Sequence, residues 1–202
     1  MSIDPTNTAL ILIDLQRGIV ARETSPRPAA EVVANAARLA RRFRERAALV
    51  ILVRVDFAYD DDDRLKPRAE EPVPPRSAMP PDFAELVPEL ERAPSDIVIT
   101  KHQWGAFYGT ELDLQLRRRG IKTLVLGGIS TNFGVESTAR DAYERGYDQI
   151  FVEDAMAGLS QGAHEFAIKT IFPRIGKIVS TEAVVGRAFS PPSGEKVPRS
   201  GG

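Results

Sequence analysis

Two oppositely charged residues directly follow apolar runs of strand length, and they are the first candidates for chemistry. Asp14 comes after the run ALILI, and Lys101 follows the run Ile97 to Thr100. The carboxyl ends of parallel strands meet at one edge of a sheet, where ligand crevices form. Both side chains can then reach one crevice, where each favours the charged form of the other. An aspartate after a strand also commonly just turns or caps the chain, so the hypothesis rests on the pair.

A glycine-containing turn, GGISTNFGV, is the third candidate. It joins the apolar run Thr123 to Leu126 to a helical pattern that begins near residues 132–134. Gly127 and Gly128 permit close backbone approach or unusual dihedral angles. The free N–H groups of the helix would face the crevice and suit an anion or a developing oxyanion. Taken alone, the same pattern also fits a capped helix behind a glycine turn.

Aromatic and polar residues near the two charges are further candidates. Trp104, Phe107 and Tyr108 follow the lysine in a glycine-containing turn, where they could form the wall against a planar ligand. Packing in the core or between subunits explains these aromatic residues equally well. Gln16 stands two residues beyond the aspartate and could point the same way, as a polar contact to the substrate.

Strand-length apolar runs alternate with helical patterns along the chain. Several runs are rich in valine and isoleucine without alternation, which is typical of strands covered on both faces. The order predicts an α/β fold with a three-layer, doubly wound, Rossmann-like sheet of about six mostly parallel strands and helices on both faces. The predicted strands are Ala9 to Ile13, Leu49 to Val55, Ile97 to Ile99, Thr123 to Leu126, Ile150 to Val152 and Lys177 to Val179.

Four helices are predicted from apolar residues at three-and-four spacing and from start and stop signals. Proline ends the last of them in this prediction, because it cannot donate to the helix ladder. The four run from the prolines at 26 and 28 through Phe43, from about Glu111 to Arg119 between Thr110 and Gly120, from about Phe133 to Arg145 before Gly146, and from Ser160 to the boundary between Phe172 and Pro173.

Residues 1–189 are predicted to form one domain, with two segments outside the alternation of strands and helices. The segment Phe57 to Pro94 is rich in proline and charge and contains one short predicted helix around Asp82 to Leu90. Connections of this length are usually functional, so we expect a lid or an interface, with a passive excursion as the alternative. The tail, residues 190–202, has almost no apolar content and is expected to be disordered.

Composition excludes several classes of protein. The chain has 202 residues, of which 43% are hydrophobic and 27% charged, and its net charge of -1 leaves no basic surplus for nucleic acid or a membrane surface. Residues 1–13 lack the features of a signal peptide, and no apolar run approaches the roughly 20 residues that span a bilayer. We therefore expect a cytoplasmic protein. The chain contains no cysteine, which excludes disulfides and protein thiol chemistry.

The motifs around these candidates resemble those of the isochorismatase-like hydrolases, the cysteine hydrolase superfamily that includes nicotinamidases and N-carbamoylsarcosine amidohydrolase. They are IDLQ around Asp14, KHQWGAFYGTELDLQLRRRGI from Lys101, GGISTNFGVESTARDAYERGY, and VEDAMAG from Val152. The resemblance covers nearly the whole chain in order and spacing. It implies that Asp14 and Lys101 match the family's catalytic aspartate and lysine, and that Gly134 stands at the position of the nucleophilic cysteine.

The resemblance also implies how the turn would bind a substrate. It predicts a non-proline cis peptide between Ile129 and Ser130, with backbone amides at Gly134 and near Ser130 as oxyanion donors. Ile129, Ser130 and Thr131 are accordingly predicted to contact the substrate. The hydroxyls of Ser130, Thr131 and Ser137 lie nearby in the sequence, but none occupies the position of the nucleophile.

Without a thiol, covalent amide hydrolysis in its usual form is not available. The true isochorismatases of the superfamily also lack the cysteine, and the resemblance implies their route, in which the aspartate protonates a vinyl ether and water then attacks. Asp14 would be the general acid, Lys101 would orient and tune it, and the helix N-terminus would bind a carboxylate or developing charge. The lysine lowers the pKa of the aspartate, which opposes this role unless desolvation raises that pKa again.

We therefore predict a hydrolase that acts without a cofactor on a small, carboxylated molecule. The alternative is a catalytically inactive ligand-binding or regulatory protein on the same scaffold. No metal is expected, because nicotinamidases carry an aspartate and histidines after the second strand, where this chain reads VDFAYDDDDRLKPR. His102 and His164 are isolated and are expected at the surface or at caps. The resemblance implies a homo-oligomer, a dimer or larger, with subunit contacts or a lid in residues 57–94.

Overall fold

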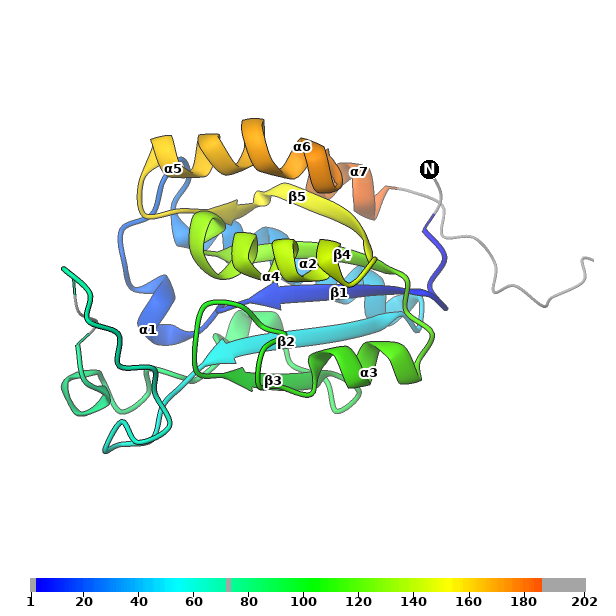
Figure 1. The fold of residues 1–202 in the computed structure, drawn as a ribbon. Coiled ribbons are helices and arrows are strands. Elements are labelled where there is room, and N and C mark those ends of the chain that lie inside the picture. Colours follow the sequence, from blue (N-terminus) through cyan, green and yellow to red (C-terminus); the bar gives the residue numbers. More distant parts are fainter. Residues whose placement is uncertain (1–2, 72–73, 187–202) are drawn as a thin grey trace, which may run out of the picture.

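Six parallel strands form one sheet in the order β3-β2-β1-β4-β5-β6, with helices on both faces (Figure 1). The structure is a computed structural model that describes residues 3–71 and 74–186. It confirms the predicted doubly wound α/β fold. The strands are β1 (Thr8–Ile13), β2 (Leu49–Val55), β3 (Ile97–Lys101), β4 (Thr123–Ile129), β5 (Asp148–Ala157) and β6 (Lys177–Val179).

The central strand, β1, is buried along its whole length and is apolar at five of its six positions, TALILI. It pairs in parallel with β2 on one side and with β4 on the other. Helices cover both faces of such a strand, which explains why its sequence does not alternate between apolar and polar residues. The core that results surrounds β1 up to Ile13, the residue before Asp14.

The helices divide between the two faces of the sheet. Buried residues of α2 and α7 pack on one face, and those of α3, α4 and α6 pack on the other. α2 buries one side of its surface, because its apolar residues recur every three or four positions. The helices are α1 (Arg17–Val20), α2 (Ala29–Glu45), α3 (Leu112–Arg118), α4 (Glu136–Glu144), α5 (Gln161–Phe166), α6 (Phe172–Ile175) and α7 (Thr181–Val185).

Two predicted helices differ from the structure. The helix after Ser160 does not stop before Pro173: it continues through a π-helical stretch, Ala167–Ile171, into α6, whose first turn contains this proline. Proline is tolerated in a first turn, because the N–H it lacks has no partner there. The predicted helix around residues 82–90 is wrong, because only the 3-10 turn Pro88–Leu90 forms.

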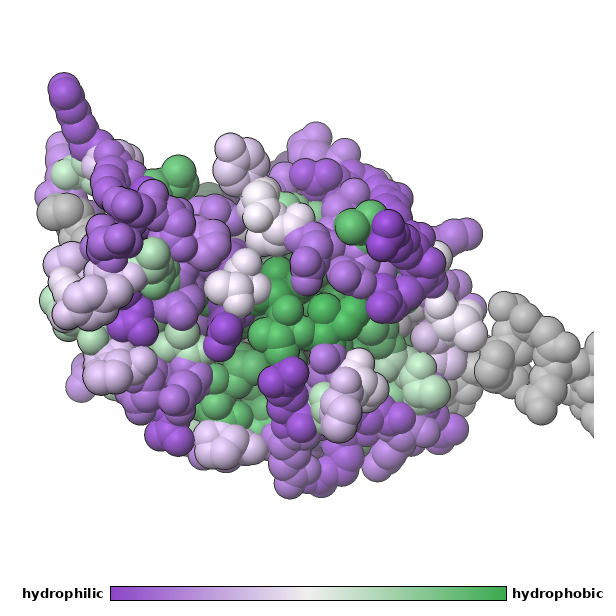
Figure 2. All heavy atoms as spheres, turned by 90° about the horizontal axis from the view of Figure 1, so that it is seen from below, coloured by the Kyte–Doolittle hydropathy of each residue, from purple (hydrophilic) through white to green (hydrophobic). Residues whose placement is uncertain are grey.

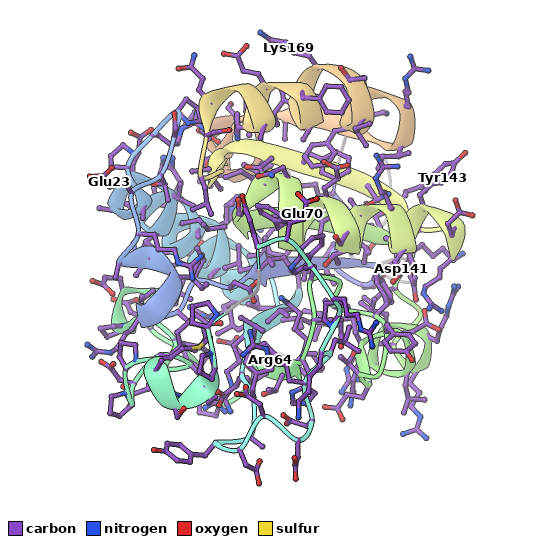
Figure 3. All side chains as sticks on the ribbon, turned by 60° about the vertical axis from the view of Figure 1, so that its left-hand side comes forward. Glu23, Arg64, Glu70, Asp141, Tyr143 and Lys169 are labelled. Carbon is purple, nitrogen blue, oxygen red and sulfur yellow. The ribbon has the colours of Figure 1, made fainter. Side chains whose placement is uncertain are left out.

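Hydrogen bonds from charged side chains join distant parts of the long segment between β2 and β3. The Asp61 carboxylate accepts the backbone N–H of Arg76 at 3.1 Å and the Arg64 guanidinium at 3.0 Å. Arg64 also donates to the carbonyl of Pro74 at 2.6 Å. In Figure 3 the part of this segment that carries Arg64 and Glu70 stands in front of the carboxyl edge of the sheet.

The edge strand β3 borders an apolar part of the surface. Figure 2 shows apolar residues gathered on the side of the molecule where β3 lies, with polar residues around them. Val98 and Thr100 of this strand line a groove of about 530 Å³ together with residues 85–88. Residues 85–88 belong to the segment where we expect subunit contacts, and those contacts stay a prediction.

None of the helices in the described part of the chain has the length and the apolar content that crossing a membrane requires. The tail that we expect to be disordered, residues 190–202, lies outside the described residues.

Candidate functional site

The order of the strands brings two of the candidates together. The chain leaves β1 toward β2 and later returns to β4 on the other side of β1, so the direction of winding reverses between β1 and β4. Ligands of doubly wound folds bind beyond the carboxyl ends of the strands at such a reversal. Asp14 directly follows β1, and the turn that begins at Ser130 directly follows β4.

Asp14 is held in an unusual backbone conformation with its carboxylate buried. Its φ angle is 53°, in the left-handed region that aspartate tolerates better than most residues. Its backbone N–H donates to the carbonyl of Val53 in β2 at 2.8 Å, which fixes the end of β1. The side chain is 8% exposed. Oδ2 accepts a hydrogen bond from Lys101, whereas Oδ1 is buried without a hydrogen-bond partner among the described residues.

Lys101 reaches this carboxylate from the end of β3, across the end of β2. Its Nζ atom lies 2.8 Å from Oδ2 of Asp14, and its side chain is 2% exposed. Nζ also donates to the carbonyl of Gln103 at 3.0 Å. The amide of Gln103 donates in turn to the carbonyls of Gly105 and Tyr108, which holds the loop after β3 in place. Asp14 and Lys101 therefore lie together as the sequence predicted.

Burial and the lysine shift the pKa of Asp14 in opposite directions. Burial raises the pKa from 3.8, because the charged form loses its hydration, and the nearby Lys101 lowers it by charge and by its hydrogen bond. The loss of hydration is the larger effect, so the pKa of Asp14 is raised. This direction favours a carboxyl group that can carry a proton.

The end of β4 passes so close to β1 that residue 128 has to be glycine. Gly128 has a φ angle of 129°, and a Cβ atom there would lie 2.1 Å from the carbonyl oxygen of Ile13. The peptide bond between Ile129 and Ser130 is cis, which confirms the prediction. The Ile129 side chain is fully buried in the core, so just its backbone borders the turn.

A π-helical stretch, Thr131–Val135, follows the turn and leads into α4. Such stretches are common at functional sites. The carbonyl of Ser130 accepts the N–H groups of Phe133 and Val135, both at 3.2 Å. Gly134 lies between these two residues. A Cβ atom built on it would be 3.0 Å from Oδ2 of Asp14 and 2.9 Å from Cγ2 of Ile13, so its backbone directly faces the carboxylate.

Thr138 links this stretch to the loop after β3, and the sequence analysis missed it. Its Oγ1 atom donates to the carbonyl of Gly134 at 2.7 Å and accepts the N–H of Ala106 at 3.1 Å. The side chain is fully buried. The spacing of four residues from Gly134 is the signal that could have found it, since a threonine in a helix often donates to the carbonyl four residues before it.

Two predicted substrate contacts, Gln16 and Phe107, have partners within the protein, and their contact with a substrate stays a prediction. Gln16 is fully buried, and its amide donates to the carbonyls of Val55 and Phe83 and accepts the N–H of Val55, at 2.7–2.9 Å. All of its donors are used to hold the segment after β2. Phe107 is 4% exposed and stacks on Tyr147 in the core, with ring centroids 5.9 Å apart.

The two other aromatic candidates are accessible. Trp104 is 60% exposed, and its ring meets that of Phe133 edge to face, with centroids 4.9 Å apart. The carbonyl oxygen of Trp104 would lie 3.6 Å from a Cβ atom at Gly134, so this residue adjoins the turn. Tyr108 is 70% exposed. Their contact with a substrate stays a prediction.

The two histidines have different surroundings. His102 is partly exposed, and its Nδ1 atom lies 2.8 Å from the carbonyl oxygen of Asp56. His164 is not at the surface, contrary to prediction: it is 1% exposed, and its Nδ1 atom lies 2.8 Å from Oγ1 of Thr131. The described residues contain no cluster of three or more histidine, aspartate or glutamate side chains placed to hold a metal ion.

Comparison with known proteins identifies the family of this chain. Residues 8–183 match the isochorismatase domain family. An uncharacterized isochorismatase family protein of Bacillus subtilis, YwoC, is 51% identical over 183 residues, which are 90% of this chain and 94% of that protein. The structure of an isochorismatase family protein from Burkholderia thailandensis superposes with a TM-score of 0.87 at 45% identity, over 92% of this chain and 96% of that one.

A more distant relative carries a named activity. The ureidoacrylate amidohydrolase RutB of Methylorubrum extorquens is 45% identical over 109 residues, but the match spans 52% of this chain and 43% of that enzyme. The Bacillus subtilis and Burkholderia thailandensis proteins, which match over nearly their whole length, are named for the family alone. With its six-stranded sheet and a matching domain over residues 8–183, the chain belongs to the isochorismatase family of hydrolases.

Proposed function

We propose that this protein hydrolyses a small, carboxylated molecule by acid-assisted attack of water, without a covalent intermediate. Asp14 is the general acid, and Lys101 orients it. The observation that carries the proposal is the buried carboxyl group of Asp14, which has a raised pKa and one oxygen, Oδ1, without a partner in the described part of the chain. A group of this kind is typical of a catalytic acid.

The hydrogen bonds of Asp14 favour one of its oxygens as the proton donor. Oδ2 accepts the hydrogen bond from Lys101, so the proton of the neutral form belongs on Oδ1. In a vinyl ether, this proton would pass to the terminal carbon of the double bond, and water would add to the carbon that bears the oxygen. The proton released by water returns to Asp14. Collapse of the adduct yields an alcohol and a ketone.

The side chains near Asp14 support water as the nucleophile. Gly134 has no side chain, and a Cβ atom there would already press on Ile13. The hydroxyl of Ser130 donates to Oδ1 of Asn132 at 3.0 Å, and that of Thr138 donates to the carbonyl of Gly134. These two hydroxyls are therefore engaged elsewhere. A hydroxyl nucleophile needs a base beside it, and the one hydroxyl of the turn that lies beside a histidine, that of Thr131, is fully buried.

Backbone amides supply the binding site for a substrate carboxylate in this proposal. The N–H groups at the start of the stretch that begins at Thr131 are not all used by the helix, since the first residues of a helix have no carbonyl before them to bond. They carry the positive end of the helix dipole, which attracts anions. Gly134 allows an anion to approach this backbone closely.

The experiment is a panel of substrates that contains isochorismate, other vinyl ethers and small amides. We expect turnover of a vinyl ether or a related carboxylated compound, and a loss of at least 1,000-fold in kcat for Asp14→Asn, which keeps the shape of the side chain but cannot donate an acidic proton. Asp148→Asn is the matched control, because Asp148 is exposed at the opposite end of the sheet. This control should retain full activity.

Two outcomes would contradict the proposal. One is turnover that Asp14→Asn leaves unchanged. The other is tight binding of a ligand that is recovered intact, measured by calorimetry and followed by mass analysis. The second outcome would identify the protein as a ligand-binding or regulatory member of the family.

A further inference from the structure

His164 and Thr131 form a buried polar pair beside the candidate site. The Nδ1 atom of His164, in α5, lies 2.8 Å from Oγ1 of Thr131, the first residue after the cis peptide and Ser130. The histidine is 1% exposed and the threonine is fully buried. The pair joins α5 to the turn whose amides would hold the substrate.

The other ring nitrogen of His164 shows that packing alone does not explain a histidine at this position. Nε2 is buried and has no hydrogen-bond partner among the described residues. An unsatisfied buried nitrogen costs free energy, whereas an apolar side chain of similar size would fill the same space without that cost. The bond to Thr131 is thus the interaction that distinguishes histidine from an apolar residue at position 164.

The loop before α5 packs against the same turn. A Cβ atom on Gly158 would lie 3.2 Å from Oδ1 of Asn132 and 3.5 Å from Cβ of His164, so these three residues are in close contact. Oδ1 of Asn132 also accepts the hydroxyl of Ser130. Ser160 caps α5 by accepting the N–H of Ala163 at 3.3 Å, which fixes the start of the helix.

His164 acts here without charge. Burial and, to a smaller extent, the Arg27 guanidinium lower the pKa of its imidazole to about 4, against an opposing effect of the Glu165 carboxylate. The ring is therefore neutral near pH 7. A neutral ring has no net charge to attract an anion, and it contacts the site through the hydrogen bond to Thr131.

We infer that His164 is a positioning residue, which fixes the turn Ser130–Gly134 through Thr131 and thereby aims the backbone amides that bind the substrate. The role rests on the proposed function, because it concerns the amides assigned there. Small errors in the placement of such groups reduce rates strongly, which is why the supporting side chains of a site are themselves held by hydrogen bonds.

Kinetics of matched variants test this role. We expect His164→Leu and Thr131→Val each to lower kcat 10- to 100-fold and to raise KM about tenfold, because the misplaced amides both bind the substrate less well and hold it in the wrong position. The double variant should be no worse than either single one, because both remove the same bond. His164→Asn should recover activity to within about threefold of wild type, since its amide can occupy the place of Nδ1. Phe166→Leu, on the exposed side of α5, is the control.

The inference is wrong if folded His164→Leu keeps its kcat within twofold. It is also wrong if the effects of the two single variants simply add, or if His164→Asn is as impaired as His164→Leu. Circular dichroism and thermal unfolding establish that each variant is folded before its rates are compared.

A second measurement needs neither turnover nor a stable leucine variant. The chain has two histidines, so their ¹⁵N signals are few enough to assign by replacing His102. In wild type we expect one neutral tautomer of His164 at pH 7, and in Thr131→Val we expect its nitrogen shifts and the amide shifts of residues 130–134 to change together. Acetate serves as the probe anion, and its binding to these amides should weaken at least tenfold in Thr131→Val.

Unchanged amide shifts and unchanged acetate binding would overturn the inference. If no substrate is turned over while these shifts and the binding of acetate change as expected, the proposed function fails and the positioning role of His164 stands.

Discussion

Nζ of Lys101 lies 2.8 Å from Oδ2 of Asp14, and neither side chain is more than 8% exposed. The two residues come from strands that are not neighbours, and 87 positions separate them in the chain. A buried ion pair of this kind stabilises a fold poorly, because the loss of hydration offsets most of the attraction. Its presence at the edge of the sheet is better explained by chemistry than by stability.

We expect Lys101→Met to destabilise the protein and Asp14→Asn to relieve that effect. Lys101→Met leaves a buried carboxylate alone and should lower the free energy of unfolding by about 3–5 kcal/mol. In the double variant both charges are gone, and most of the loss should be recovered. Asparagine is chosen because it tolerates the positive φ angle of residue 14. Urea unfolding of wild type, the two single variants and the double variant measures the coupling energy between the two side chains. Losses of stability that simply add in the double variant would contradict this prediction.

The rate should fall as pH rises. The general acid is active when protonated, and the pKa of Asp14 is raised above 3.8, so kcat/KM should be constant at low pH and decline as pH passes through the raised pKa. Because folding raises the pKa of Asp14, folding favours its protonated form. Its contribution to stability is therefore full below about pH 3.8 and is lost as pH rises through the pKa of the folded protein. A pH–rate profile checks this, together with the ¹³C carboxyl signal of Asp14. A rate that instead increases with pH would assign Asp14 as a base.

Gly134 should not tolerate a side chain. A Cβ atom there presses on Ile13 in the core and on the Asp14 carboxylate, so Gly134→Ala should cost about 1–3 kcal/mol of stability and lower the rate at least tenfold. Gly162→Ala is the matched control, since nothing lies within 4 Å of its Cβ position. Thermal unfolding and kinetics of Gly134→Ala and Gly162→Ala test this prediction. Gly134→Cys provides a single thiol, and a gain of amide hydrolysis in this variant would show that the site can accept a nucleophile after all.

Replacement of His164 should change how stability depends on pH. Its pKa is about 4 in the folded protein, below the ordinary value of 6.5, so the neutral form is favoured by folding. The stability it contributes is present above pH 6.5 and is lost as pH falls toward 4, by roughly 3 kcal/mol at most. The difference in free energy of unfolding between wild type and His164→Asn should therefore shift by about this amount across that range. A difference that is constant with pH would contradict the buried, neutral imidazole.

Gln16 should affect stability more than substrate binding. Gln16→Leu removes its hydrogen bonds to the backbone of Val55 and Phe83 and leaves those groups unsatisfied, at a cost of about 1–3 kcal/mol or more. We expect a lower midpoint of urea unfolding and a KM within threefold of wild type. A large rise in KM at unchanged stability would support the interpretation as a substrate contact.

Strand positions were predictable because buried parallel strands leave an uninterrupted apolar run. β2 and β6 have the bounds that the sequence predicted, and Asp14 and Lys101 lie where strand ends placed them. The position of Pro173 inside a continuing helix was not predictable from the sequence, because a π-helical stretch before it lets a new first turn begin at Phe172. Proline marks a break in the helix ladder, but tertiary packing decides whether the helix axis continues.

The finer structure of the site was predictable in part. The sequence placed Gln16 near Asp14, but it could not show that the segment around Phe83 lies beside residues 16–18 and accepts a hydrogen bond from the amide of Gln16. Phe107 and Trp104 are three residues apart in a loop without regular periodicity, so nothing indicated that one is buried and the other exposed. The bond between Thr131 and His164 spans 33 residues and depends on how α5 packs against the turn.

The lack of a side chain at Gly134 also determines how the site reacts with oxidants. A catalytic thiolate is readily converted by peroxide to sulfenic and then to irreversibly oxidised acids, and alkylating reagents block it. This chain has no sulfur of that kind, because its sequence contains three methionines and no cysteine. A carboxyl group and backbone amides do not undergo these reactions, so the proposed chemistry is built from groups that oxidative stress leaves intact.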